Sequence, residues 1–367
     1  MKNNNQTIQK KVALYDPFFD VLGGGERHIL SILQVLEYLG YEINIFWDED
    51  LTSQIEKNLK LSFTKLHFHK NIFRSKNSIS RLKELGKFDI LFYVTDGSYF
   101  VSSAKKTFIF CMVPNKKLYN MNFFNKIKLI NASFIANSDF TKKWLSKWGI
   151  DSKTILPYIS DDFLKIDTNF TKKNQILSVG RFFPHLHSKR QDVAIDSFIK
   201  LQKLNPAFAN YTLHLAGSVT KEDEGYLEAL KKQANNNPAI IFHPNIEFSN
   251  LIKLYQTSAY YWHFAGFDVD ENEQPEKTEH LGITPLEAMA AGCITMAYNA
   301  GGPKEIIEDG ANGFLFNSEQ ELFEKMDSLI KSTDKISKIK LTARKFIEDN
   351  FSYSVFTNRV KQVLLQS

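Results

Sequence analysis

The sequence predicts an α/β protein with two doubly wound, mostly parallel-sheet domains that face each other across a cleft. The chain has 367 residues, which exceeds what a single hydrophobic core usually organises. Short apolar runs alternate with amphipathic segments of helical length, a pattern typical of βαβ units. A second series of such runs begins at about residue 174, after a polar stretch. We therefore expect an N-terminal domain over residues 1–165 and a C-terminal domain over residues 170–349.

In the first half of the chain, six apolar runs are expected to form strands, and amphipathic segments follow several of them. The most regular of these segments is ERHILSILQVLEYLG, in which Gly40 is a suitable C-terminal stop for a helix. The six runs are KVALYDPFF, YEINIFW, KLHFH, FDILFYV, KTFIFCMV and ASFIANS.

In the second half, the polar stretch from Asp161 to Asn174 is the predicted linker, and six further runs are expected to form a second parallel sheet. The closing segment from Lys340 to Ser367 has a helical pattern. Its last part, over about 350–367, is a helix that can pack back on the N-terminal domain. The six runs are QILSVG, YTLHLAG, AIIFHPN, AYYWHFAG, CITMAYN and GFLFN.

The composition indicates a globular protein of a reducing compartment. Hydrophobic residues at 43% and charged residues at 24% lie within the ordinary range of globular proteins. Cys111 and Cys293 both stand in apolar surroundings, which is typical of buried thiols rather than of a disulfide framework or a zinc site. The N-terminal MKNNNQTIQKK lacks the apolar core of a signal peptide, and no run approaches the ~18–20 apolar residues that span a bilayer. We expect a cytoplasmic protein, at most peripheral on the inner face of the plasma membrane.

The charge is distributed unevenly. Residues 1–165 contain 24 Lys and Arg against 16 Asp and Glu, a net of +8, and the remainder contains 22 against 25, a net of −3. A basic half favours an anionic partner such as a phospholipid surface or a diphosphate-linked lipid. A solvated lysine-rich surface explains the same asymmetry equally well. We do not expect a nucleic-acid partner.

A glycine loop follows the first predicted strand, in the sequence DVLGGGER around Gly24. Glycines allow close approach of a ligand to the backbone, and the following helix offers unpaired N–H groups to an anion. A dinucleotide fingerprint would require a third glycine where His28 stands, so that interpretation fails. The loop favours phosphate binding over a purely structural tight turn.

Cations cluster after the first strand of the second half. QILSVG ends at Gly180 and Arg181, and Lys189 and Arg190 open the next predicted helix. Fixed cations at the exit of a parallel strand are well placed to neutralise a diphosphate. Since surface arginines are common, these residues alone fit a solvated surface equally well.

The most informative segment runs from Glu279 to Gly292, with the sequence EHLGITPLEAMAAG. Pro285 suits the first turn of a helix that continues through Gly292. Glu287 then lies early in this helix, and the amides of Ile283, Thr284 and Leu286 are expected to face outward at its positive end. A carboxylate there can accept two hydrogen bonds from the paired hydroxyls of a ribose. The alternative for both glutamates is a structural, helix-capping role.

These residues resemble a known family. The pattern Glu-x7-Glu, then Ala-Met-Ala-x-Gly and Gly-Gly-x-x-Glu, resembles the retaining GT-B glycosyltransferases of family 4, whose two domains are Rossmann-like. The resemblance covers nearly the whole chain. It includes the glycine loop, IANS at 135–138, Gly180-Arg181 with Lys189, and DGANG at 309–313.

The resemblance implies a role for each matching position. Arg181 and Lys189 would hold the donor diphosphate and support catalysis, with help from Gly24, and Glu287 would bind the ribose. Glu279 would contact the transferred sugar near the reacting carbon. The donor-binding set implied by the resemblance is Gly24, Arg181, Lys189, Ile246, Ile283, Thr284, Leu286 and Glu287, with Ile246 beside the base.

Two features depart from the family pattern. Many relatives carry a histidine after the fifth strand, but this chain reads FCMVP there, so the acceptor-side base is open and Asp96 is a candidate substitute. An acidic insert, FDVDENEQPEKTE, precedes Glu279, and its Asp268-Val-Asp270 mimics a metal-binding motif of another transferase fold. We interpret this insert as a solvated loop. His185 and His187 lack a third ligand nearby, so we expect no metal and no other cofactor.

From the resemblance we expect a metal-independent, retaining transfer of a sugar from a UDP- or GDP-sugar to a hydroxyl group. The expected acceptor is a glycan or lipid-linked acceptor of cell-envelope polysaccharide or glycolipid synthesis. A GT-B sugar-nucleotide epimerase remains an alternative within the enzyme class. A catalytically silent protein that binds nucleotides or glycans is the alternative outside it.

Overall fold

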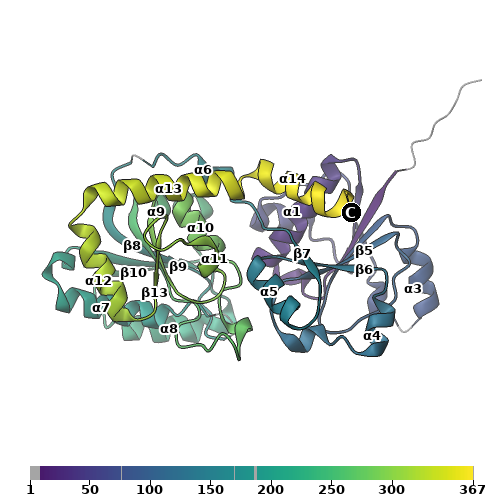
Figure 1. The fold of residues 1–367 in the computed structure, drawn as a ribbon, viewed down its shortest axis with the longest axis horizontal. Helices are drawn as coiled ribbons and strands as arrows, with labels where there is room; N and C mark the ends of the chain where they lie inside the picture. Colours follow the sequence, from purple (N-terminus) through teal and green to yellow (C-terminus); the bar gives the residue numbers. More distant parts are fainter. Residues whose placement is uncertain (1–8, 76, 169, 186–187, 367) are drawn as a thin grey trace, which may run out of the picture. The chain divides into compact units, whose positions relative to one another are not determined.

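The computed structural model describes residues 9–75, 77–168, 170–185 and 188–366 (Figure 1). Residues 1–8 of the N-terminal segment in which we expect no signal peptide, and His187, lie outside the described residues. The described parts of Met1–Pro157 and Thr357–Ser367 form one compact unit, and Tyr158–Phe356 form the other. Each unit is an α/β unit built on its own parallel sheet. Among the described residues, no helix is both long and apolar enough to cross a membrane.

The first unit contains a seven-stranded sheet in the order β3-β2-β1-β4-β5-β6-β7 within the described residues, and every neighbouring pair is parallel. All six apolar runs of this half form strands, as predicted. The strands are β1 (Lys11–Tyr15), β2 (Glu42–Phe46), β3 (Leu66–His69), β4 (Ile90–Val94), β5 (Lys106–Cys111), β6 (Ala132–Ala136) and β7 (Ser152–Thr154).

Helix α1 (Gly24–Tyr38) follows β1 and presents an apolar face to the sheet. Its start is stabilised by Glu26, whose carboxylate accepts a hydrogen bond from the Gly23 amide at 2.6 Å. The chain leaves the helix through Gly40, which adopts φ +90°, so the predicted stop is confirmed. The other helices of this unit are α2 (Thr52–Gln54), α3 (Ser78–Leu85), α4 (Phe123–Lys128) and α5 (Asp139–Lys147).

The second unit contains a six-stranded sheet in the order β10-β9-β8-β11-β12-β13 within the described residues, again entirely parallel. Each of the six predicted runs forms a strand. The strands are β8 (Lys173–Val179), β9 (Thr212–Gly217), β10 (Ile240–Pro244), β11 (Ser258–His263), β12 (Ile294–Tyr298) and β13 (Phe314–Phe316).

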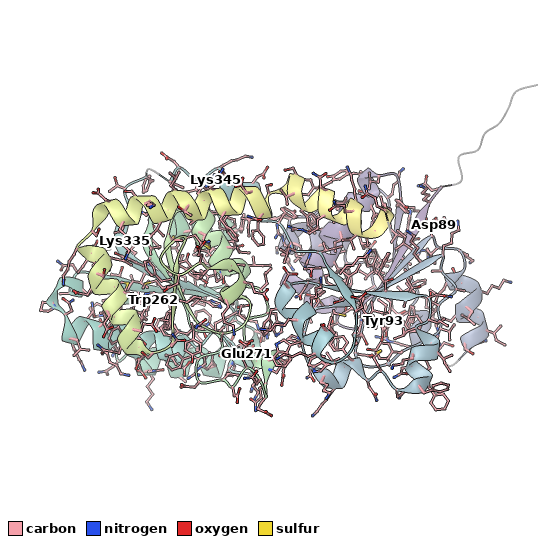
Figure 2. All side chains as sticks on the ribbon, in the orientation of Figure 1. Asp89, Tyr93, Trp262, Glu271, Lys335 and Lys345 are labelled. Atoms are coloured by element: carbon pink, nitrogen blue, oxygen red, sulfur yellow. The ribbon has the colours of Figure 1, made fainter. Side chains whose placement is uncertain are left out.

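Helices cover the second sheet, and Trp262 on β11 is fully buried in the core beneath them (Figure 2). The predicted linker differs from expectation, because it contains a helical turn, α6, whose Phe163 is buried. The C-terminal segment is helical, as predicted. Its last helix, α14, lies within the predicted range 350–367, and it begins in the second unit and ends in the first. The helices are α6 (Asp161–Leu164), α7 (Gln191–Leu204), α8 (Glu224–Gln233), α9 (Phe248–Thr257), α10 (Ile283–Ala290), α11 (Pro303–Ile306), α12 (Glu319–Ile330), α13 (Thr333–Phe351) and α14 (Tyr353–Leu365).

A buried acid lies at the end of β1. Asp16 is fully buried, and its Oδ1 accepts a hydrogen bond from the Phe18 amide at 2.9 Å, whereas Oδ2 has no hydrogen-bond partner among the described residues. Burial, and the nearby Glu26, raise the pKa of Asp16 to about 7. Because the unfolded chain ionises this group at a pKa of about 3.9, the native state holds the proton more tightly than the unfolded state.

We therefore expect Asp16→Asn to gain stability relative to the wild type as the pH rises. The wild type binds more protons when folded, so its free energy of unfolding falls between about pH 4 and pH 7, by on the order of 4 kcal/mol in all. Asparagine does not ionise, so the free energy of unfolding of the variant does not fall through this change. Urea unfolding at about pH 4.5 and pH 8 measures the difference, and Glu49→Gln, at an exposed position of the same unit, is the control. A stability difference that does not change with pH would contradict the burial of a protonated Asp16.

Candidate functional site

The candidate site lies in the second unit, where the strand order changes direction. β8 and β11 are neighbours at the centre of the sheet, although three helices and two strands separate them along the chain. In doubly wound sheets, ligands bind beyond the carboxyl ends of the strands at such a switch point. Gly180 and Arg181 follow β8, His263 ends β11, and the loop with Glu279 leads into α10.

Lys189 and Glu279 form an ion pair at this switch point. The lysine stem passes directly over Gly180, because a Cβ atom added at Gly180 would lie 2.3 Å from the Lys189 Cγ. Any side chain at position 180 would therefore displace the lysine. The ammonium at the end of this stem reaches the Glu279 carboxylate, and both side chains are largely buried. Two residues that are 90 positions apart are thus brought together.

Glu279 is held as a carboxylate by its surroundings. Burial alone would raise its pKa, but the Lys189 ammonium and His263 outweigh this effect and hold the pKa of Glu279 well below its usual range. The His263 Nε2 lies 3.0 Å from the Glu279 Oε2. Burial lowers the pKa of His263, so the imidazole is neutral near pH 7. The group therefore carries one fixed negative and one fixed positive charge.

Arg181 is fixed through its backbone. The buried Gln191 side chain donates to the carbonyl oxygens of Gly180 and Arg181, at 3.2 and 3.1 Å. The Arg181 guanidinium stacks on the Phe183 ring, 3.8 Å from its centroid. Within the described residues it forms no ion pair with a carboxylate. This cation is available to a ligand at the end of β8.

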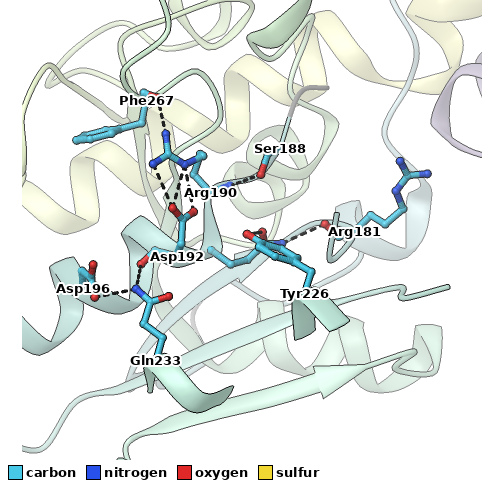
Figure 3. Close-up of polar contacts among 9 residues, drawn as sticks. Arg181, Ser188, Arg190, Asp192, Asp196, Tyr226, Gln233 and Phe267 are labelled. Atoms are coloured by element: carbon cyan, nitrogen blue, oxygen red, sulfur yellow. Dashed lines mark hydrogen bonds and ion pairs between the residues drawn. The ribbon is translucent and has the colours of Figure 1, made fainter. Parts of the chain in front are cut away.

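We expected Arg190 to add to the cationic cluster, but its guanidinium is occupied by other contacts. It adopts φ +52° as the residue before α7, and its guanidinium donates to the Asp192 carboxylate at 3.1 Å and to the Phe267 carbonyl at 2.7 Å. Figure 3 shows these contacts together with the hydrogen bonds that the Gln233 amide donates to the Asp192 carbonyl oxygen and to the Asp196 carboxylate. Arg190 is therefore already neutralised, and it fastens the start of α7 to the loop after β11.

The start of α10 presents two backbone amides. Gly282 precedes the helix with φ +100°, a conformation that favours glycine. Ile283 and Thr284 occupy the first two helical positions, where an amide has no acceptor within the helix. Pro285 lies in the first turn, as predicted. The Leu286 amide differs from the expectation, because it donates to the Gly282 carbonyl at 3.1 Å and is the first amide committed to the helix.

The end of α10 also differs from the prediction. The helix stops at Ala290, and Gly292 adopts φ +73° beyond it instead of continuing the helix. The Cys293 amide returns to the Ala288 carbonyl at 2.9 Å, which closes the last turn.

Glu287 is oriented by a buried tyrosine from α9. The Tyr255 hydroxyl donates to the Glu287 Oε2 at 2.9 Å and also lies 3.4 Å from the Thr284 carbonyl oxygen. Tyr255 is fully buried, and burial together with the Glu287 charge raises its pKa well above its usual value. It therefore remains a hydrogen-bond donor at any ordinary pH. Tyr261 holds Thr284 in the same way, with its hydroxyl 2.7 Å from the Thr284 Oγ1.

A pair of glycines supports the loop that carries Glu279. The Gly302 amide donates to the Glu279 carbonyl at 2.7 Å. A Cβ atom at Gly301 would lie 2.1 Å from the same carbonyl oxygen, and one at Gly302 would lie 2.4 Å from the Leu281 Cα. Only glycine fits at these positions, and so the Gly-Gly motif acts as the backbone support of Glu279.

The acidic insert is only in part the solvated loop that we expected. Asp268 and Asp270 are exposed, but Glu271 is largely buried (Figure 2). Its carboxylate accepts from the Gly301 amide at 2.7 Å and pairs with the Lys304 ammonium at 2.7 Å. The insert is therefore fastened to the glycine pair behind Glu279. In the part of the chain that the structure describes, no cluster of three or more His, Cys, Asp or Glu side chains could hold a metal ion.

Ile246 lies in the turn between β10 and α9, at the same edge of the sheet. The preceding Asn245 adopts φ +51°, and its amide donates to the Gly217 carbonyl at 2.8 Å, which fixes the turn against the end of β9. His243 on β10 stacks on His214 on β9, with ring nitrogens 2.9 Å apart. The turn is thus rigid, and Ile246 is half-buried in it.

Two predicted residues belong to the first unit. Gly24 is the first residue of α1, at the carboxyl end of β1. Asp96 follows β4, and its carboxylate accepts from the amide and the hydroxyl of Ser98, at 2.9 and 2.6 Å. Asp96 is exposed, so it can meet a ligand, but part of its hydrogen-bonding capacity is used in this turn.

Sequence reasoning missed three residues that hold the site: His263, Tyr255 and Gln191. A polar side chain at the end of a buried strand or on the inner face of a helix is usually a satisfied core residue, so position alone does not single these out. The signal for His263 is its place as the last residue of the run AYYWH, at the carboxyl end of a central strand.

Comparison with known proteins gives a family and related folds. The family model "Glycosyl transferases group 1" matches residues 160–346. A curated relative, the GDP-Man:Man(3)GlcNAc(2)-PP-Dol alpha-1,2-mannosyltransferase of Dictyostelium discoideum, is 28% identical over 277 residues, which are 68% of this chain and 52% of the relative. The chain spans about half the length of the curated relatives it matches.

Solved structures share the fold. A glycosyltransferase from Rickettsia africae ESF-5 superimposes with a TM-score of 0.73 at 20% identity, over 98% of this chain and 100% of that one. Anabaena Alr3699/HepE, solved with UDP and glucose, superimposes with a TM-score of 0.68 at 16% identity, over the same shares. The fold is therefore GT-B, with two Rossmann-like units.

Proposed function

The chain belongs to the glycosyl transferases group 1 family, and from this premise we propose that it is a retaining glycosyltransferase. It transfers a sugar from a nucleoside-diphosphate donor to a hydroxyl of a glycan or lipid-linked acceptor. The observation that carries the proposal is the gathering of Arg181, Lys189, Glu279 and Glu287 at the switch point of the second sheet. A diphosphate, a ribose and a sugar each require one of these groups.

The donor diphosphate binds between the end of β8 and the start of α10. The unpaired Arg181 guanidinium can take two phosphate oxygens at once. An ammonium has three donor hydrogens, so Lys189 can keep its bond to Glu279 and still reach a phosphate oxygen. The Ile283 and Thr284 amides supply further donors at the positive end of the helix.

The nucleoside is held by Glu287 and the turn at Ile246. Glu287 accepts from the paired ribose hydroxyls, and the Tyr255 hydroxyl orients its carboxylate for this. Ile246 contacts the base. The named relatives differ in nucleotide, since one is a GDP-Man transferase and the other was solved with UDP. We therefore propose a UDP- or GDP-sugar and leave the choice between them to experiment.

In the reaction, the bond between the anomeric carbon and the diphosphate oxygen breaks, and the acceptor oxygen bonds to the same face of that carbon. Positive charge develops on the sugar and negative charge on the leaving diphosphate. We assign Glu279 to stabilise the first, and Arg181 and Lys189 to stabilise the second. The acceptor proton passes to a base, for which Asp96 is the candidate, or to the departing diphosphate. We propose no metal requirement.

A panel of UDP-, GDP- and ADP-sugars tests this proposal by thermal shift and by transfer assay. A donor at about 100 times its Kd should stabilise the protein by roughly 2.7 kcal/mol, and transfer should continue in EDTA. The anomeric configuration of the product, read by NMR, should match that of the donor. Stabilisation without transfer or donor hydrolysis would indicate a silent binding protein. Release of UDP and an epimerised sugar in the absence of acceptor would indicate an epimerase.

A further inference from the structure

Helix α4 lies in the first unit and is labelled in Figure 1. Four large apolar side chains are exposed on α4 and the turn that follows it. Phe123 and Phe124 are each 73% exposed, Ile127 is 52% exposed and Ile130 is 81% exposed. The two phenylalanine rings meet edge to face, with centroids 5.9 Å apart. Single exposed apolar residues are ordinary, but a contiguous cluster usually marks an interaction surface. We call these four residues the α4 patch.

The α4 patch stands on a fixed base. Leu129 and Tyr119, which flank α4, are buried in the core of the first sheet. The Asn122 side chain caps the helix by accepting from the Asn125 amide at 2.9 Å. Val101, another exposed apolar residue, lines the same small cavity of about 30 Å³ as Ile130, so the apolar area continues to it. The backbone is thus anchored while the apolar side chains remain outside the core.

Positive charge surrounds the α4 patch. Residues 97–138 contain six lysines and no aspartate or glutamate. Lys105 pairs with Asp89 from outside this stretch, at 2.6 Å. Within the described residues, Lys116, Lys117, Lys126 and Lys128 form no ion pair. At about 100° per residue, Lys126 and Lys128 fall on either side of the sector that contains Phe123, Phe124 and Ile127. The helix therefore has an apolar stripe with a basic border.

We propose that the α4 patch docks the enzyme on an anionic lipid bilayer. The exposed phenylalanines enter the boundary between headgroups and acyl chains, and the lysines contact anionic headgroups. This surface is separate from the donor site of the second unit, so the proposal goes beyond the transfer reaction. The transfer reaction does not explain the positive charge of residues 1–165, and membrane docking would give that charge a role.

A second copy of the chain is the main competing occupant. In a symmetric dimer the same patch would face itself, and the lysines on both copies would be brought together without acidic partners. Residues 97–138 offer no carboxylate to relieve that repulsion. A bilayer containing anionic lipid supplies both the apolar phase and the opposite charge. The charge of the border therefore favours the bilayer.

Co-sedimentation of the full chain with vesicles tests this proposal. Binding should be strong to phosphatidylcholine mixed with phosphatidylserine, weak to phosphatidylcholine alone, and reversed by salt. Phe123→Ser/Phe124→Ser should lower binding at least tenfold, by an order-of-magnitude estimate from the apolar area lost. Lys126→Gln/Lys128→Gln should lower it about 25-fold, since each engaged lysine is worth about fivefold. Thermal unfolding of each variant establishes that it is folded.

A matched control lies on α3 of the same unit. Ile79 is 80% exposed and Lys83 is exposed nearby, but neither belongs to the α4 patch. Ile79→Ser/Lys83→Gln should bind vesicles like the wild type. Binding that is equal on neutral and anionic vesicles, or equal losses in the α3 and α4 variants, would overturn the proposal. So would a concentration-dependent dimer in sedimentation velocity that Phe123→Ser/Phe124→Ser abolishes, because the patch would then be a protein interface.

Discussion

Replacing Glu279 with glutamine is expected to lower kcat for sugar transfer by about 10²–10³-fold, the usual cost of losing one preorganised electrostatic contact in a transition state. The carboxylate is held ionised beside Lys189 and His263, so in the proposed complex it can stabilise the positive charge that develops on the sugar. Glutamine has nearly the same shape and keeps an oxygen acceptor. It removes the charge with little change in packing.

The same substitution should leave the affinity for the bare nucleoside diphosphate within about threefold of the wild type, or make it slightly tighter. Glutamine attracts Lys189 less than a carboxylate does, so the ammonium is freer to contact a phosphate oxygen. A loss of turnover without a loss of nucleotide binding separates a contact to the sugar from a contact to the nucleotide.

Calorimetry with the nucleoside diphosphate, beside kcat for transfer, measures both quantities. Glu273→Gln is the matched control, since Glu273 is exposed in the acidic insert of the same segment. A large loss of nucleotide affinity in Glu279→Gln would place Glu279 at the nucleotide instead of the sugar. Full activity would reduce it to a residue that fixes the loop.

The fold was largely predictable, because strand and helix periods are local properties of the sequence. All twelve apolar runs form strands. β7 was not predicted, since Ser152, Lys153 and Thr154 form a three-residue edge strand with no apolar pattern. The helical turn α6 was not predicted either, because it lies in a polar stretch. Phe163 is its buried residue.

The candidate site was predictable only at the positions that carry a motif. Glu279 and Lys189 could be named from the sequence, but their ion pair could not, because it depends on how β8 and β11 are placed side by side. The hydrogen bond from Tyr255 to Glu287 could not be predicted either, because the two residues lie on different helices, α9 and α10. The Leu286 amide illustrates the opposite case. The motif predicted that this amide faces outward and donates to a ligand. In the structure it donates instead to the Gly282 carbonyl oxygen, within the helix.

Polar residues of a loop are the hardest to assign from sequence. Glu271 and its neighbours Asp268 and Asp270 look alike in an acidic insert. The difference between them arises from a contact to Gly301, 30 positions away, which no local pattern reports. A charged run is thus a weak guide to which of its members are solvated.

Replacing Glu287 with alanine is expected to weaken binding of the nucleoside diphosphate and of the sugar donor alike, by about 10- to 150-fold. This corresponds to roughly 1.5–3 kcal/mol for hydrogen bonds to a charged acceptor. Stability should change little, because the Tyr255 hydroxyl, 3.4 Å from the Thr284 carbonyl oxygen, can bond there instead. Tyr255→Phe keeps the carboxylate but removes the donor that orients it. Its loss of affinity should be smaller, about 2- to 12-fold.

A nucleoside diphosphate that lacks both ribose hydroxyls provides the decisive control. If Glu287 binds those hydroxyls, the 2′,3′-dideoxy nucleotide should bind the wild type and Glu287→Ala with equal affinity, because neither complex contains the contact. The Tyr255→Phe variant should likewise lose its effect on this ligand. Calorimetry on the three proteins with both nucleotides completes the cycle. If Glu287→Ala weakens the dideoxy nucleotide as much as the natural one, the glutamate acts on the structure of α10 and not on the ribose.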